Sequence, residues 1–307
     1  MQRRQLLTGS VLLLTLLAMM SALPITITAQ GDKFEQKVDI GGYRLFIRCT
    51  GEGSPTVILE GPYSETSNVW RFVEPKVSQF TRVCVYERAG IGSSDQRPDH
   101  KTVVGVNKVN EELHTLLANA TIPEPYVLAG WSYGGLVVNA YTRHYPEQVV
   151  GAVFVDSSNI KQFSIQTIPP DRSSLGTQQI VADFQTLPPF PPIPLIVLQQ
   201  SPRYLDQNDP ILKVWPTYQA EFAKLSPQGQ LIVAANSDHA IPEREPALVI
   251  NALARVVAIV RGGSAVPSPT PFWTPQPTNT AGTSPTTIPT KAFSFPPSPT
   301  FKPTATK

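Results

Sequence analysis

The sequence predicts an α/β fold, a mostly parallel sheet in which strands alternate with helices. Short apolar runs alternate with segments of helical periodicity between residues 33 and 261. The run VVGAVFVD at 149–156 is apolar almost throughout, which is typical of a strand buried on both faces of a parallel sheet. Parallel neighbours need long right-handed crossovers, so we expect helices on both faces of the sheet.

The expected elements follow in chain order from these patterns. The strands are residues 42–50, 55–60, 82–86, 126–130, 149–156, 194–198 and 231–235. The helices are residues 106–117, 135–144 and 246–260, of which the first and last carry apolar residues at helical spacing. Residues 157–193 separate two of the strands, and an insertion of that length is expected to form a small cap over the site.

The first 29 residues are typical of an export signal. Arg3 and Arg4 precede the apolar run at 11–20, and a small-residue cleavage point ends at Ala29. We expect a secreted or cell-surface protein. The alternative is an uncleaved anchor, since residues 6–29 approach the length of about 20 residues that spans a bilayer. The membrane is a partner only in that case.

Residues 264–307 differ in composition from the α/β domain expected at 30–263. This segment contains 11 Pro, 11 Thr and 5 Ser and no acidic residue. Such a composition buries too little apolar surface to offset the entropy of ordering the chain, so we expect a disordered tail. Thr, Ser and Pro in this proportion are typical of an O-glycosylated stalk, which would associate with the cell surface; a solvated tail is the alternative.

Composition excludes several classes of function. Lys and Arg number 25 against 23 Asp and Glu, and no basic stretch interleaves with aromatic residues, so we expect no nucleic-acid partner. The chain has 2 cysteines, too few for a zinc or iron–sulfur site built on four cysteines. It also lacks the His-Glu-x-x-His motif of zinc metalloproteases. We expect neither a metal nor a cofactor.

One motif carries the chemistry. The sequence YVLAGWSYGGL at 126–136 places Gly-x-Ser-x-Gly between an expected strand and an expected helix. A sharp turn there would expose the hydroxyl of Ser132 at a helix N-terminus, where the dipole favours negative charge. The context predicts Ser132 as a nucleophile; an ordinary glycine-rich turn with a capping serine is the alternative.

A serine nucleophile needs a general base, and the chain has 4 histidines. His239 follows the strand expected at 231–235, downstream of Ser132, in the chain order serine, acid, histidine. His114 and His144 lie in or at the end of expected helices, and His100 lies in a polar segment. This order favours His239 as the base.

These residues together resemble the α/β-hydrolase fold superfamily, in its serine hydrolase, esterase-like branch. The resemblance covers residues 33–261. It rests on the strand VILEG, the turn YERAGIGSS with Glu87 at the acidic position, the elbow AGWSYGG and the loop DHAIP. It implies a hydrolase of small acyl substrates that works through an acyl-enzyme, and the pattern of the first 29 residues adds the expectation that this enzyme is exported. An acyltransferase with the same residues, and a non-catalytic surface protein on this fold, are the alternatives.

The acid of the triad is less sharply defined by the sequence. In much of the superfamily it follows the strand expected at 194–198, but that register falls near Arg203. Asp156 ends the preceding strand, at the edge of the sheet where ligands bind in open α/β folds, and we favour it. Asp206 and Asp209 remain alternatives.

The resemblance also implies an oxyanion hole made of two backbone N–H groups. The first belongs to Tyr133, the residue after the nucleophile. The second comes from the loop after Glu60, where Pro62 has no N–H and Tyr63 falls at the donor position. Both donors would face the oxygen on which negative charge develops.

Cys49 and Cys84 are expected to form a disulfide. Export places a protein in an oxidising compartment, where disulfides persist. In the fold that this chain resembles, the strands at 42–50 and 82–86 lie close together. The alternative is a pair of buried free thiols packed as small apolar residues.

Overall fold

The computed structural model describes residues 33–99, 104–164 and 174–263. The expected signal segment and the Pro/Thr-rich tail lie outside these residues. Within them, no helix has both the length and the hydropathy that a membrane span requires.

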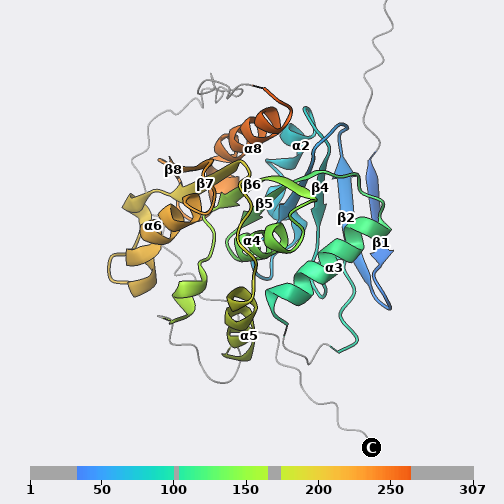
Figure 1. Cartoon of the computed structure of the whole chain (residues 1–307), viewed down its shortest axis with the longest axis horizontal. Helices are drawn as coiled ribbons and strands as arrows, with labels where there is room; N and C mark the ends of the chain where they lie inside the picture. The colour runs from blue at the N-terminus through green and yellow to red at the C-terminus, as the bar shows by residue number, and fades with distance from the viewer. Residues whose placement is uncertain (1–32, 100–103, 165–173, 264–307) are drawn as a thin grey trace, which may run out of the picture. The chain divides into compact units, whose positions relative to one another are not determined.

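The core of the fold is a sheet of eight strands in the order β1-β2-β4-β3-β5-β6-β7-β8 (Figure 1). From β4 onward in this order the neighbouring strands are parallel, whereas β2 pairs antiparallel with both β1 and β4. The strands are β1 (Phe34–Asp39), β2 (Arg44–Thr50), β3 (Thr56–Glu60), β4 (Val83–Tyr86), β5 (Tyr126–Trp131), β6 (Val149–Val155), β7 (Leu195–Gln200) and β8 (Gly229–Ala234).

The mostly parallel α/β sheet and the seven expected strands are confirmed, and β1 is an addition. The sequence of β1, FEQKVD, contains no apolar run that would predict a strand, and in the structure only its Val38 is buried. It is an edge strand with a partner on one side. Most ends of the seven expected strands differ from the observed ends by one or two residues. β7, for example, continues two residues beyond its expected end, to Gln200.

Helices cover both faces of the sheet. One buried cluster joins α3 (Val106–Asn119), α4 (Tyr133–His144) and α6 (Pro210–Ala223) to one face, and another joins α2 (Glu74–Val77), α7 (Ile241–Arg244) and α8 (Pro246–Val260) to the other. Figure 1 shows α2 and α8 together on one side, with α3 and α4 on the other. The described residues also form three short 3₁₀ segments: η1 (Ser67–Trp70), η2 (Ile160–Ser164) and η3 (Pro202–Tyr204).

The described residues of the insertion at 157–193 include two helical segments, η2 and α5 (Ser174–Gln185), with non-helical residues at either end. Helix α5 packs through Ile180 against Val106 of α3 and Leu136 of α4. The carboxylate of Asp183 accepts a hydrogen bond of 3.0 Å from the backbone N–H of Asn107, in the first turn of α3. Tyr133 packs against the same cluster, so the insertion reaches the start of α4.

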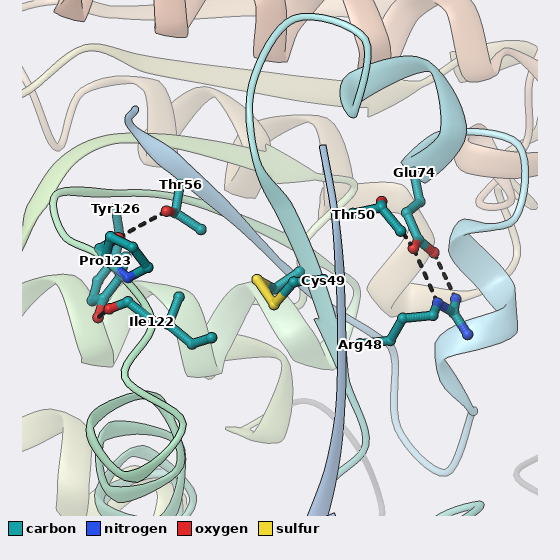
Figure 2. The surroundings of a disulfide bond; sticks show 9 residues. Arg48, Cys49, Thr50, Thr56, Glu74, Ile122, Pro123 and Tyr126 are labelled. Carbon is teal, nitrogen blue, oxygen red and sulfur yellow. Dashed lines mark hydrogen bonds and ion pairs between the residues drawn. A yellow bond between two sulfur atoms is a disulfide. The ribbon is translucent and has the colours of Figure 1, made fainter. Parts of the chain in front are cut away.

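The expected disulfide joins β2 to β4. Cys49 and Cys84 are directly opposite each other in the antiparallel pair, with 4.0 Å between their Cα atoms (Figure 2). Both side chains are buried. The bond therefore fixes the antiparallel part of the sheet from inside the core.

Loss of this disulfide is expected to lower the free energy of unfolding. The bridge closes a sequence separation of 35 residues, for which the chain-entropy model gives about 3–4 kcal/mol. Urea unfolding of the protein and of Cys84→Ala measures the difference. Alkylation of the denatured, non-reduced protein should find no free thiol; two free thiols would contradict the assignment.

Candidate active site

Ser132 lies in a strained turn between β5 and α4. Its backbone has φ 56° and ψ −120°, in a region that residues with a Cβ rarely adopt. The close approach of the backbone around Ser132 leaves no room for a side chain at Gly130, because a Cβ there would lie 2.3 Å from the carbonyl oxygen of Gly134. The predicted elbow therefore has the geometry that projects a nucleophile from the edge of a sheet.

The backbone of Ser132 is held by the neighbouring strand and the segment after it. Its N–H donates to the carbonyl oxygen of Val155 at 3.1 Å, and its carbonyl oxygen accepts from the N–H of Ser158 at 2.9 Å. Trp131 and Val155 are register partners in β5 and β6. Ser132 follows β5 and Asp156 follows β6, so the two residues lie at the same, carboxyl end of these parallel strands.

The structure brings Asp156 and His239 together. Nδ1 of His239 lies 2.7 Å from Oδ2 of Asp156, although 83 residues separate them. Asp156 is fully buried directly after β6, and His239 follows β8. Because a carboxylate accepts hydrogen bonds, this contact places the hydrogen of the neutral imidazole on Nδ1 and leaves Nε2 as the basic nitrogen.

The second oxygen of Asp156 accepts two further hydrogen bonds. The indole Nε1–H of Trp215, in α6, donates to Oδ1 at 2.8 Å, and the backbone N–H of Gln200, at the end of β7, donates at 2.9 Å. Oδ1 is therefore occupied, and the carboxylate is oriented so that Oδ2 faces the imidazole. These two donors were not predicted from the sequence.

Two tryptophans lie against His239. The ring of Trp131 is 5.8 Å from the imidazole, and its Nε1–H donates to the carbonyl oxygen of His239 at 2.8 Å. The ring of Trp215 is 6.0 Å away, edge to face. Trp131 therefore fixes the backbone of the histidine, and Trp215 fixes its acidic partner.

The alternative acids have local structural roles. Asp206 accepts hydrogen bonds from the backbone and side chain of Asn208, two residues further on. Asp209 is the N-cap of α6 and accepts from the N–H groups of Ile211 and Leu212. These contacts explain both carboxylates without a catalytic role.

The two expected oxyanion donors belong to neighbouring residues. Tyr133 is the first residue of α4, where backbone N–H groups have no acceptor within the helix. Tyr63 lies in the loop after β3, and its ring meets the ring of Tyr133 edge to face, with 5.5 Å between centroids. Gly130 of β5 pairs with Glu60 of β3, which brings this loop beside the elbow.

The other described histidines are engaged elsewhere. The ring of His114 stacks on the ring of Tyr145 at 4.1 Å, and Nε2 of His144 lies 2.9 Å from the side-chain oxygen of Asn107. Among the described residues, no group of three or more His, Cys, Asp or Glu side chains could hold a metal ion.

Comparisons with known proteins agree with this fold. Residues 55–188 match the family model described as alpha/beta hydrolase fold. A pimeloyl-[acyl-carrier protein] methyl ester esterase of Vibrio cholerae is 32% identical over 143 residues, which are 46% of this chain and 52% of that protein. A probable transporter of Hormonema carpetanum is 33% identical over 127 residues, which are 39% of this chain and 18% of that protein.

The likeness to solved structures covers more of the chain. A thermophilic esterase from Thermogutta terrifontis has 18% sequence identity and a TM-score of 0.55, over 75% of this chain and 99% of that one. At this identity the likeness concerns the fold. The chain thus spans about half the length of the curated esterase that it matches, and nearly all of a solved esterase fold.

Proposed function

This chain belongs to the α/β-hydrolase fold superfamily, and we propose that it is an exported serine hydrolase that cleaves ester-type acyl substrates. Ser132 is the nucleophile, His239 the general base and Asp156 the acid. The observation that carries the proposal is the 2.7 Å contact between His239 and Asp156, next to a serine in a strained elbow.

The geometry supports a two-stage reaction. Oγ of Ser132 attacks the substrate's carbonyl carbon while Nε2 of His239 takes the hydroxyl proton. The carbonyl oxygen becomes negative and accepts hydrogen bonds from the N–H groups of Tyr133 and Tyr63. Collapse of this intermediate breaks the ester bond, and the imidazolium returns the proton to the leaving alcohol. Water then repeats the sequence on the acyl-enzyme and releases the acid.

Asp156 supports both proton transfers. Its Oδ2 holds Nδ1–H of His239 and stabilises the positive imidazolium that forms when Nε2 is protonated. With Oδ1 held by Trp215 and Gln200, the carboxylate does not need to reorient during the cycle. A site arranged in advance in this way avoids a reorganisation cost in the transition state.

Labelling with a fluorophosphonate tests the proposal. An activated serine should take up one label per chain, and peptide mapping should place it on Ser132. A panel of nitrophenyl esters of graded acyl length then defines the acyl group that the site accepts. Absence of both labelling and ester hydrolysis in the folded protein would exclude the function.

Export is the second part of the proposal. It is supported by the basic and apolar pattern of residues 1–29 and by the disulfide, a bond that persists in oxidising compartments. N-terminal sequencing of protein recovered from the culture medium should begin at Gln30. Recovery only from membranes, with the N-terminus intact, would indicate an anchor instead.

A further inference from the structure

Two adjacent residues after β4 contact both ends of the loop that carries Tyr63. This loop, residues 61–67, follows β3. At its start, the guanidinium of Arg88 donates to the carbonyl oxygen of Gly61 at 2.9 Å and also to that of Pro62. At its end, the carboxylate of Glu87 accepts from the backbone N–H of Ser67 at 3.2 Å and from its hydroxyl at 2.9 Å.

These contacts are buried. Arg88 is 9% exposed and forms an ion pair with Glu60, which is 1% exposed at the end of β3. A buried guanidinium is strongly unfavourable unless it is paired and its N–H groups have acceptors. Here the acceptors are the carboxylate and the two loop carbonyls, so Arg88 is satisfied only while the loop keeps this conformation.

The elbow packs against the same loop. A Cβ on Gly134 would lie 2.6 Å from the carbonyl oxygens of Glu60 and Gly61. The guanidinium of Arg88 also lies over the ring of Tyr133, 5.3 Å from its centroid. Arg88 therefore contacts the backbone just before Tyr63 and the side chain of Tyr133, the two residues whose N–H groups form the proposed oxyanion hole.

Glu87 is fixed from its other side. Its Oε2 accepts from the backbone N–H of Ser93 at 2.6 Å. A Cβ on Gly92, which has φ +51°, would lie 2.2 Å from the same oxygen. The turn that follows β4 thus leaves room for the carboxylate and orients it toward Ser67.

We propose that Glu87 and Arg88 are positioning residues of the oxyanion hole, because together they hold both ends of the 61–67 loop and so aim the N–H of Tyr63. The inference rests on the proposed function. The charge on the substrate oxygen develops only in the transition state, so a loop that loses its position should lower kcat and leave KM nearly unchanged.

The test is the kinetics of ester hydrolysis by variants at Arg88. Loss of a single oxyanion donor lowers kcat about 10²–10³-fold, so Arg88→Met should lower kcat about 100-fold with KM within about threefold. Arg88→Lys should recover part of the loss, since one ammonium group keeps the charge near Glu60 but lacks the fork that reaches two carbonyls. Affinity for a boronic acid that mimics the intermediate should fall by about the same factor as kcat.

Two further variants separate positioning from folding. Glu60→Gln/Arg88→Met leaves no unpaired buried charge and should show the same kcat loss as Arg88→Met. Arg48→Met is the control, because Arg48 forms a bidentate pair with the buried Glu74 and, in the described structure, donates no hydrogen bond to the 61–67 loop (Figure 2). It should keep the kcat of the unaltered protein.

Three results would overturn the inference. One is an Arg88→Met protein with kcat within about threefold of the unaltered chain. Another is a parallel change in kcat and KM in the double variant, and the third is an equal kcat loss in Arg48→Met, which would indicate general destabilisation. If the unaltered protein itself neither hydrolyses esters nor takes the fluorophosphonate, the proposed function fails, and this inference fails with it.

Discussion

Ser132→Ala is expected to lower kcat for ester hydrolysis by three to six orders of magnitude. Removing the nucleophile of a Ser-His-Asp triad leaves only the catalysis that comes from binding and from the oxyanion hole. The substitution removes one oxygen from a side chain and keeps the strained backbone of the elbow. Initial rates on a nitrophenyl ester, with the thermal midpoint as a check of folding, measure the effect.

Ser78→Ala is the matched control for this prediction. The hydroxyl of Ser78 donates to the carbonyl oxygen of Pro75 at the end of α2, in an exposed contact outside the site. Its loss should leave kcat unchanged. A Ser132→Ala protein that retains activity within about tenfold would remove Ser132 from the mechanism.

Asp156→Asn is expected to lower kcat by about 10⁴-fold, as when the acid of such a triad is replaced by its amide. The donors from Trp215 and Gln200 would hold the amide oxygen at the position of Oδ1. The amide NH₂ would then face Nδ1 of His239. Nδ1 would have to accept, so the hydrogen would move to Nε2, where the base must be free.

Asp209→Asn and Asp206→Asn are the matched comparisons. Asparagine caps a helix about as well as aspartate, so Asp209→Asn should keep α6 and therefore keep kcat within a few-fold. Measurement of kcat for all three variants at one pH gives the ranking. If Asp206→Asn or Asp209→Asn is worse than Asp156→Asn, the acid belongs to the later loop.

The sequence predicted the parts of the site that are encoded locally. The elbow could be predicted because the strand, the glycines and the helix around Ser132 are contiguous. Asp156 could be favoured because it follows an unmistakable buried strand. The choice between Asp156 and Asp206 or Asp209, however, depends on which strand end faces the His239 loop, and that is a property of the folded sheet.

The supporting groups could not be predicted, for physical reasons that differ. Trp215 lies in a helix that contains Pro216, a residue that normally argues against a helix interior, so α6 was not expected. Gln200 contributes a backbone N–H, which no side-chain pattern can reveal. In the sequence, Arg88 is recognisable only as part of a glycine-rich turn. Its contacts with Gly61 and Pro62 cannot be predicted without the register in which β3 pairs with β4.

The position of His239 between two indole rings gives the protein an optical property. The ring centroids of Trp131 and Trp215 lie 5.8 Å and 6.0 Å from that of the imidazole. We therefore expect the intrinsic fluorescence of the protein to respond to chemical changes beside its proposed base. The two indoles that contact the histidine and its acidic partner are therefore also intrinsic probes of the proposed site.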